Sequence, residues 1–127
     1  MASDYAKELD ILIRDKQVIP VKNGVKYKVL DKNDEDSQGL FKNAAMIRLG
    51  TKGLTMNTKH FINAEDVVLV EFDLGEYGYV KGCCEVIDCA KKEKEDIYDI
   101  HLSFIILKHA YKENIEMYIN NNENNRL

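Results

Sequence analysis

The fold is decided by the stretch Arg48-Leu49-Gly50-Thr51-Lys52-Gly53-Leu54-Thr55-Met56. The residues before it, 42–49, predict one strand, and residues 54–57 predict another. Between them the two glycines predict a tight turn, because glycine adopts turn conformations at no steric cost. This strand, turn and strand come before a series of further strands and one closing helix, and that order sets the expectations for the whole chain.

Four further segments alternate apolar and polar residues in the way that predicts half-buried strands: residues 21–30, 67–74, 79–88 and 98–105. Turns or polar loops join them, and no helical periodicity intervenes. Several short strands without helices between them indicate an antiparallel barrel or sandwich. A closed barrel also leaves no strand edge exposed. We therefore expect a mainly β fold, a small antiparallel barrel of about six strands.

Helical segments are predicted at both ends of the chain. Residues 4–14 form a short amphipathic helix whose apolar stripe is Tyr5, Leu9, Leu12 and Ile13. Residues 107–121 form a C-terminal helix with the stripe Leu107, Ala110, Tyr111, Ile115, Tyr118 and Ile119. We expect an N-terminal helical segment over residues 1–20, the barrel and its C-terminal helix over residues 21–121, and a flexible tail over residues 122–127.

Composition limits the classes of function. The chain has 127 residues, of which 45% are hydrophobic and 31% charged, which suits one folded domain. Its formal net charge of -4 disfavours nucleic acid as a general partner. No apolar run is long enough to insert in a membrane, and the N-terminus does not resemble a secretory signal. With three cysteines that do not suggest disulfides, these features predict a cytoplasmic protein.

Catalytic and metal-binding patterns are weak. The three histidines are scattered, and no G-x-S-x-G or P-loop spacing is present. Cys83 and Cys84 are adjacent in a predicted strand, so their side chains should point to opposite faces and could not share a metal ion. We therefore expect no catalytic residues, no metal and no cofactor.

Five cations form the strongest candidate binding set. Lys22, Lys26 and Lys28 precede or lie on the outer face of the first predicted strand, and Arg48 and Lys52 flank the glycine turn. If strand and turn are neighbours, the five side chains converge and could receive an anion, a phosphate or an acidic protein surface. A solvated strand face, whose lysines discourage edge pairing, explains the same residues equally well.

The order of strands, glycine turn and closing helix resembles the PilZ domain family of bacterial regulatory modules, over roughly residues 21–119. PilZ domains are small antiparallel barrels followed by a C-terminal helix. Many bind the second messenger cyclic di-GMP through an RxxxR segment just before the first strand and a DxSxxG turn. The resemblance therefore implies a regulatory module of cyclic di-GMP signalling.

The turn motif of that family falls on residues 48–53. Gly53 matches the final glycine, whereas Arg48 stands in place of the acid and Gly50 in place of the serine. A carboxylate accepts hydrogen bonds from guanine, whereas an arginine can only donate. Together with lysines where the arginine pair belongs, near Lys22 and Lys26, these departures imply weak or absent cyclic di-GMP binding.

Members of the family that lack the full motif act as adaptors that bind other proteins. The resemblance thus implies a non-catalytic adaptor in bacterial signalling, motility or surface-organelle control, with a protein partner or self-association. The predicted partner contacts are Leu9, Leu12, Tyr111 and Tyr118. The alternative is a cyclic di-GMP receptor with a divergent basic site formed by Lys22, Lys26, Lys28, Arg48, Gly50, Lys52 and Gly53. An oligonucleotide-binding barrel or an enzyme is a more distant alternative.

Overall fold

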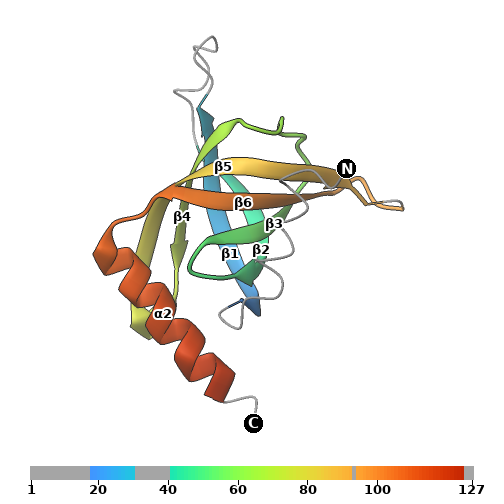
Figure 1. Ribbon diagram of the computed structural model, residues 1–127. Coiled ribbons are helices and arrows are strands. Elements are labelled where there is room, and N and C mark those ends of the chain that lie inside the picture. Colours follow the sequence, from blue (N-terminus) through green and yellow to red (C-terminus); the bar gives the residue numbers. More distant parts are fainter. Residues whose placement is uncertain (1–17, 31–40, 93, 125–127) are drawn as a thin grey trace, which may run out of the picture.

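A computed structural model describes residues 18–30, 41–92 and 94–124 of the chain. Within these ranges six antiparallel strands close into a barrel, and a C-terminal helix follows (Figure 1). The elements are β1 (Ile19–Leu30), β2 (Lys42–Leu49), β3 (Gly53–Thr58), β4 (Val67–Asp73), the 3₁₀ helix η2 (Gly75–Tyr77), β5 (Tyr79–Lys91), β6 (Tyr98–Ile106) and α2 (His109–Asn124). The mainly β barrel with a C-terminal helix is thereby confirmed. The helix predicted over residues 4–14 lies outside the described residues.

The barrel closes in the strand order β1-β2-β3-β6-β5-β4, and β4 returns to pair with β1. Every pairing is antiparallel. Because the barrel is closed, each strand has a neighbour on both sides. Closure removes the unpaired backbone groups that an open sheet would present at its edges. Because β3 pairs with β6 rather than with β4, the glycine turn after β2 lies directly beside the last strand.

Inward-facing side chains of alternating strand positions fill the barrel. Val68, Val70 and Phe72 of β4 are almost fully buried, as their alternation predicted. Inside the barrel the hydroxyl groups of Tyr27 and Thr58 form a hydrogen bond of 2.8 Å, which satisfies two polar groups that water cannot reach. The predicted opposition of the adjacent cysteines is also confirmed, since Cys84 is buried in the core whereas Cys83 is half-buried.

Helix α2 packs against one end of the barrel, where η2 connects β4 to β5 (Figure 1). Ile115 and Ile119 are buried there, and the rings of Tyr118 and Tyr77 meet edge to face with centroids 5.6 Å apart. Ala110 was predicted on the buried stripe but is exposed. His109 and Lys112 of the first turn are exposed too, whereas Tyr111 is half-buried and packs against the core. No helix among the described residues has the length and apolar character that spanning a membrane requires.

Candidate functional site

The glycine turn between β2 and β3 is held by two backbone hydrogen bonds. The Gly50 N–H donates to the Gly53 carbonyl at 2.9 Å, and the Phe104 N–H donates to the Lys52 carbonyl at 2.9 Å. At Gly53 the backbone of β6 is so close that a side chain would collide with the carbonyl group of Leu102. Packing of β3 against β6 therefore accounts for Gly53 without any ligand.

The strand ladders separate the five candidate cations. Arg48 pairs with Pro20 at the beginning of β1, whereas Lys26 lies six positions later, opposite Asn43. Along β2, Arg48 and Asn43 are five residues apart, so at about 3.3 Å per residue Lys26 lies about 17 Å along the wall from Arg48. Lys28 lies farther still. The exposed Lys22, Arg48 and Lys52 thus lie toward one end of the β1–β2 wall, and Lys26 and Lys28 toward the other.

The two lysines matched to the arginine pair of the PilZ family also differ in position from the family pattern. That pair precedes the first strand, but Lys22 and Lys26 lie within β1, which begins at Ile19. The segment that would correspond to the RxxxR element therefore ends before β1, outside the described residues. Lys26 faces Glu71 of β4 across the ladder, so an acidic group lies beside this cation.

A row of polar side chains crosses the outer wall of β2, β3 and β6, and sequence reasoning did not find it. Arg48 pairs with Thr55, and Thr55 pairs with His101. The Thr55 hydroxyl and His101 Nδ1 lie 2.9 Å apart. Burial lowers the pKa of His101, and the Arg48 charge lowers it further, although Asp88 and Asp99 oppose the shift. The signal in the sequence was the polar alternation of β3, where Thr55 and Asn57 alternate with apolar residues.

A second polar pair lies beside that row. Asn57 of β3 and Asp99 of β6 are direct partners in the ladder. The Oδ1 atoms of both side chains are buried and have no hydrogen-bond partner among the described residues. Next to Asn57 a groove of about 720 Å³ opens on the β1–β2–β3 wall. Its lining includes Val21, Lys22, Ala45, Met46, Asn57 and Ile97.

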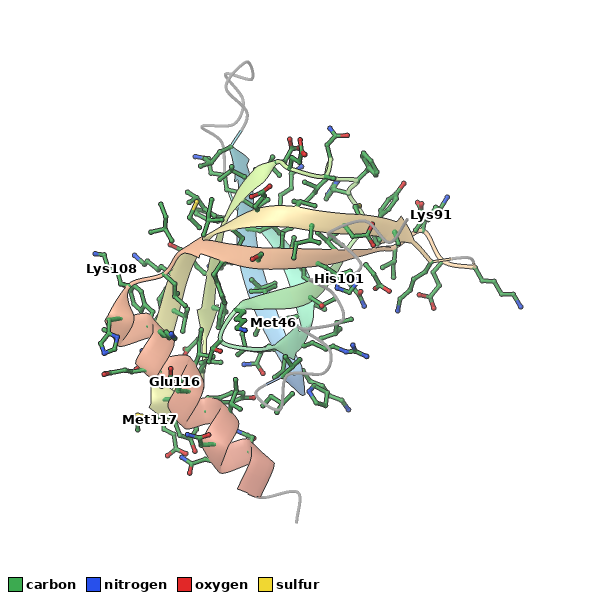
Figure 2. All side chains as sticks on the ribbon, viewed as in Figure 1. Met46, Lys91, His101, Lys108, Glu116 and Met117 are labelled. Carbon is green, nitrogen blue, oxygen red and sulfur yellow. The ribbon has the colours of Figure 1, made fainter. Side chains whose placement is uncertain are left out.

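A separate groove of about 340 Å³ lies where β6 leads into α2. Its lining includes Leu69, Lys81, Cys83, Ile106, Lys108 and Tyr111. Ile106 is 65% exposed, and Met117 is 56% exposed on the helix face that points away from the barrel (Figure 2). Of the predicted partner contacts, Tyr111 lines this groove and Tyr118 turns toward Tyr77. Leu9 and Leu12 lie outside the described residues.

No protein-family model matches the chain, and no curated protein sequence does. The fold is nevertheless found in solved structures. The chain is similar to the Bacillus subtilis inhibitor of motility, MotI/DgrA, with a TM-score of 0.70 and 8% identity, over 86% of this chain and 50% of that one. It therefore spans about half the length of that protein.

Two further solved structures match this chain over nearly their whole length. The PilZ domain of YcgR from Escherichia coli, solved with cyclic di-GMP, matches with a TM-score of 0.64 and 10% identity, over 86% of this chain and 90% of that one. A tetrameric PilZ domain from Xanthomonas campestris matches with a TM-score of 0.69 and 10% identity, over 96% and 97%. At such identities the likeness establishes architecture alone. The chain therefore has a PilZ-like fold, a closed six-stranded antiparallel barrel with a C-terminal helix packed on one end.

Proposed function

We propose that this chain is a non-catalytic regulatory module of the cyclic di-GMP signalling class. It acts as an adaptor that binds a protein partner in bacterial signalling, motility or surface-organelle control, and it binds cyclic di-GMP weakly or not at all. The observation that carries the proposal is the exposed apolar surface at the junction of β6 and α2. The similar Bacillus subtilis protein is described as an inhibitor of motility, which supports a role in regulation.

The junction surface consists of Ile106 and the other residues that line the 340 Å³ groove. Ile105 and Ile106 are 49% and 65% exposed, so a large part of each side chain contacts solvent at the end of β6, and Ile106 also lines the groove. Contiguous exposed apolar surface commonly marks a protein-interaction site. Lys81, Lys108 and Glu71 line the groove, and Glu71 Oε1 lies 3.8 Å from Lys81 Nζ, so these two charges offset each other. The partner that fits is therefore an apolar segment with an acidic residue opposite Lys108.

We expect Ile106→Asp to weaken partner binding at least tenfold, because a carboxylate would be buried against apolar groups in the complex. The partner is isolated by crosslinking in the native cell and identified, and the purified pair is then measured by calorimetry. Phe61→Asp is the matched control, because Phe61 is 59% exposed and lies outside the junction surface. Equal affinities for Ile106→Asp and the unmodified chain would contradict this surface. Self-association of the chain alone, measured by sizing, would identify a second copy as the partner, as in the Xanthomonas tetramer.

A cyclic di-GMP receptor is the second candidate, and the exposed Lys22, Arg48 and Lys52 near the glycine turn favour it. These cations can attract phosphate. Arg48, however, offers donors where guanine also presents donors, and an unpaired buried donor costs about 1–3 kcal/mol. Each 1.4 kcal/mol weakens binding about tenfold. Attraction of phosphate alone therefore leaves affinity low.

Titration of the chain with cyclic di-GMP in a calorimeter distinguishes the two candidates. We expect no saturation at high micromolar ligand. Saturable binding that is lost in Arg48→Ala, and retained in Lys91→Ala on the distant β5–β6 hairpin, would establish the receptor instead (Figure 2). Lys91 is a suitable control because it is an exposed cation far from the glycine turn.

A further inference from the structure

A row of apolar side chains crosses the outside of the barrel at the junction surface. Leu69 of β4 pairs with Cys83 of β5, and Cys83 pairs with Ile106 of β6. Val70 and Cys84, the next residues along their strands, are buried in the core, so Leu69 and Cys83 point outward. Ile106 is 65% exposed, and all three paired side chains line the 340 Å³ groove. Leu69, Cys83 and Ile106 are called the apolar row below.

The apolar row has a cation at each end. On β1, the half-buried Lys28 is the ladder partner of Leu69. Beyond β6, the exposed Lys108 lies two residues after Ile106, at the corner that leads into α2 (Figure 2). Neither lysine forms an ion pair with a residue that the structure describes. Both positive charges are therefore available to acidic groups of a partner.

The charges beside the apolar row are already paired within the barrel. Glu71 Oε1 lies 3.8 Å from Lys81 Nζ, and Glu71 Oε2 accepts a hydrogen bond of 3.1 Å from the Tyr79 hydroxyl group. Both carboxylate oxygens of Glu71 are thus engaged, and the charge of Lys81 is offset. The complementary partner surface is therefore apolar in its middle and acidic at its two ends.

The closed barrel restricts how the partner segment can lie. Each of the six described strands pairs with a neighbour on both sides, so none of them offers a free edge to which a partner strand could add. The partner segment must instead lie across the strands and bind through its side chains. Its side chains must then recur at the spacing of the apolar row.

That spacing favours a helix over an extended segment. Neighbouring strands are about 4.8 Å apart, so the row from Leu69 to Ile106 spans about 10 Å. One side chain per helical turn of about 5.4 Å gives three side chains over about 11 Å. Alternate side chains of an extended segment lie about 6.6 Å apart, so three of them span about 13 Å. The helix matches the row more closely.

We propose that the junction surface receives an amphipathic helix of the partner, which lies across β4, β5 and β6. Three apolar side chains of that helix, one per turn, contact Leu69, Cys83 and Ile106. One acidic residue a turn before this set and another a turn after it face Lys28 and Lys108. This inference rests on the adaptor function, and it adds the conformation and the charge pattern of the partner segment.

Designed peptides test this pattern on the full chain. The probe is a fluorescein-labelled helical peptide with three leucines one turn apart and a glutamate one turn beyond each end of the set. We expect saturable binding by fluorescence anisotropy, and shifts in the NMR resonances of Cys83 and Ile106. Replacing both glutamates by lysine should weaken binding at least about tenfold, because like charges would meet at both ends. A proline in the centre of the peptide should weaken it by a similar factor, because proline interrupts the helix.

A charge exchange tests whether Lys108 faces one end of the helix. Lys108→Glu should weaken binding of the glutamate peptide, and it should strengthen binding of one of the two peptides that carry lysine at a single end. Lys91→Glu is the matched control, because it makes the same change in net charge at an exposed position on the distant β5–β6 hairpin (Figure 2). Equal effects of Lys108→Glu and Lys91→Glu would overturn the proposed charge pattern.

The outcomes separate this inference from the adaptor function. If no peptide binds, or if the proline peptide binds as tightly as the helical one, the helical partner segment is overturned, whereas the partner isolated by crosslinking can still depend on Ile106. Shifts at Phe61 in place of Ile106 would also overturn it, because the peptide would then lie outside the junction surface. If the isolated partner binds Ile106→Asp and the unmodified chain equally, the adaptor surface itself is wrong, and this inference fails with it.

Discussion

Gly53→Ala is expected to lower the free energy of unfolding by about 3 kcal/mol or more, or to prevent folding altogether. A Cβ atom at this position would collide with the carbonyl oxygen of Leu102, and it would lie 3.1 Å from the carbonyl carbon and 3.2 Å from Cα of Ser103. All three atoms belong to the backbone of β6, which is held between β3 and β5. The strand cannot move aside without breaking ladder hydrogen bonds.

Chemical denaturation followed by circular dichroism measures this effect. Gly24→Ala is the matched control, because Gly24 also lies in a strand but its added Cβ would meet nothing closer than the Ala44 carbonyl oxygen at 4.0 Å. We expect the control to change stability by less than about 0.5 kcal/mol, or to raise it slightly through the entropy of the unfolded chain. If Gly53→Ala were as stable as Gly24→Ala, the close approach of β3 and β6 would be wrong.

Alternation made most strands predictable. In β4 the inward Val68, Val70 and Phe72 alternate with less buried residues, of which Glu71 and Asp73 are charged, and the predicted first residue of the strand is the observed one. In a half-buried strand, inward side chains recur at every second residue, and this period distinguishes a strand from a helix. The barrel could be predicted as well, because six short strands without helices between them need closure to pair the backbone N–H and C=O groups of the edge strands.

The observed bounds of β1 and β5 differ from the predicted ones, and both strands contain bulges. β1 begins at Ile19 and continues through Pro20, two residues before the predicted strand over residues 21–30. Proline is tolerated there because β1 pairs with β4 only from Lys26 onward, and a bulge follows Pro20. β5 continues to Lys91, beyond the predicted residues 79–88. Bulges in β5 interrupt its alternation and bury the neighbouring Val86 and Ile87 together.

The candidate site was less predictable than the fold, because it depends on register. The sequence does not show that Arg48 pairs with Pro20 and Thr55. The distance of Lys26 and Lys28 from Arg48 therefore could not be predicted. The polar row could not be predicted for the same reason. His101 and Thr55 are 46 positions apart in sequence, and only the pairing of the third strand with the last brings them within 2.9 Å.

Ile115→Ala is expected to cost about 2–4 kcal/mol and to detach α2 from the barrel. Ile115 is fully buried between the helix and the barrel, and alanine would leave a cavity there. A helix of 16 residues is marginal without tertiary contacts, so the lost packing should also reduce helix content. Tyr111, which lines the junction groove, would lose its position at the same time.

The comparison that isolates this effect is Met117→Ala, two residues farther along the same helix. Met117 is 56% exposed, so its truncation should cost less than about 0.5 kcal/mol. Hydrogen exchange of the α2 amides should accelerate in Ile115→Ala and remain slow in Met117→Ala, while the amides of β3 and β6 stay protected in both. Because partner binding at the junction surface needs a docked helix, Ile115→Ala should also abolish that binding. Equal exchange of the α2 amides in the two variants would show that Ile115 does not anchor the helix, and the junction surface would then lack its support.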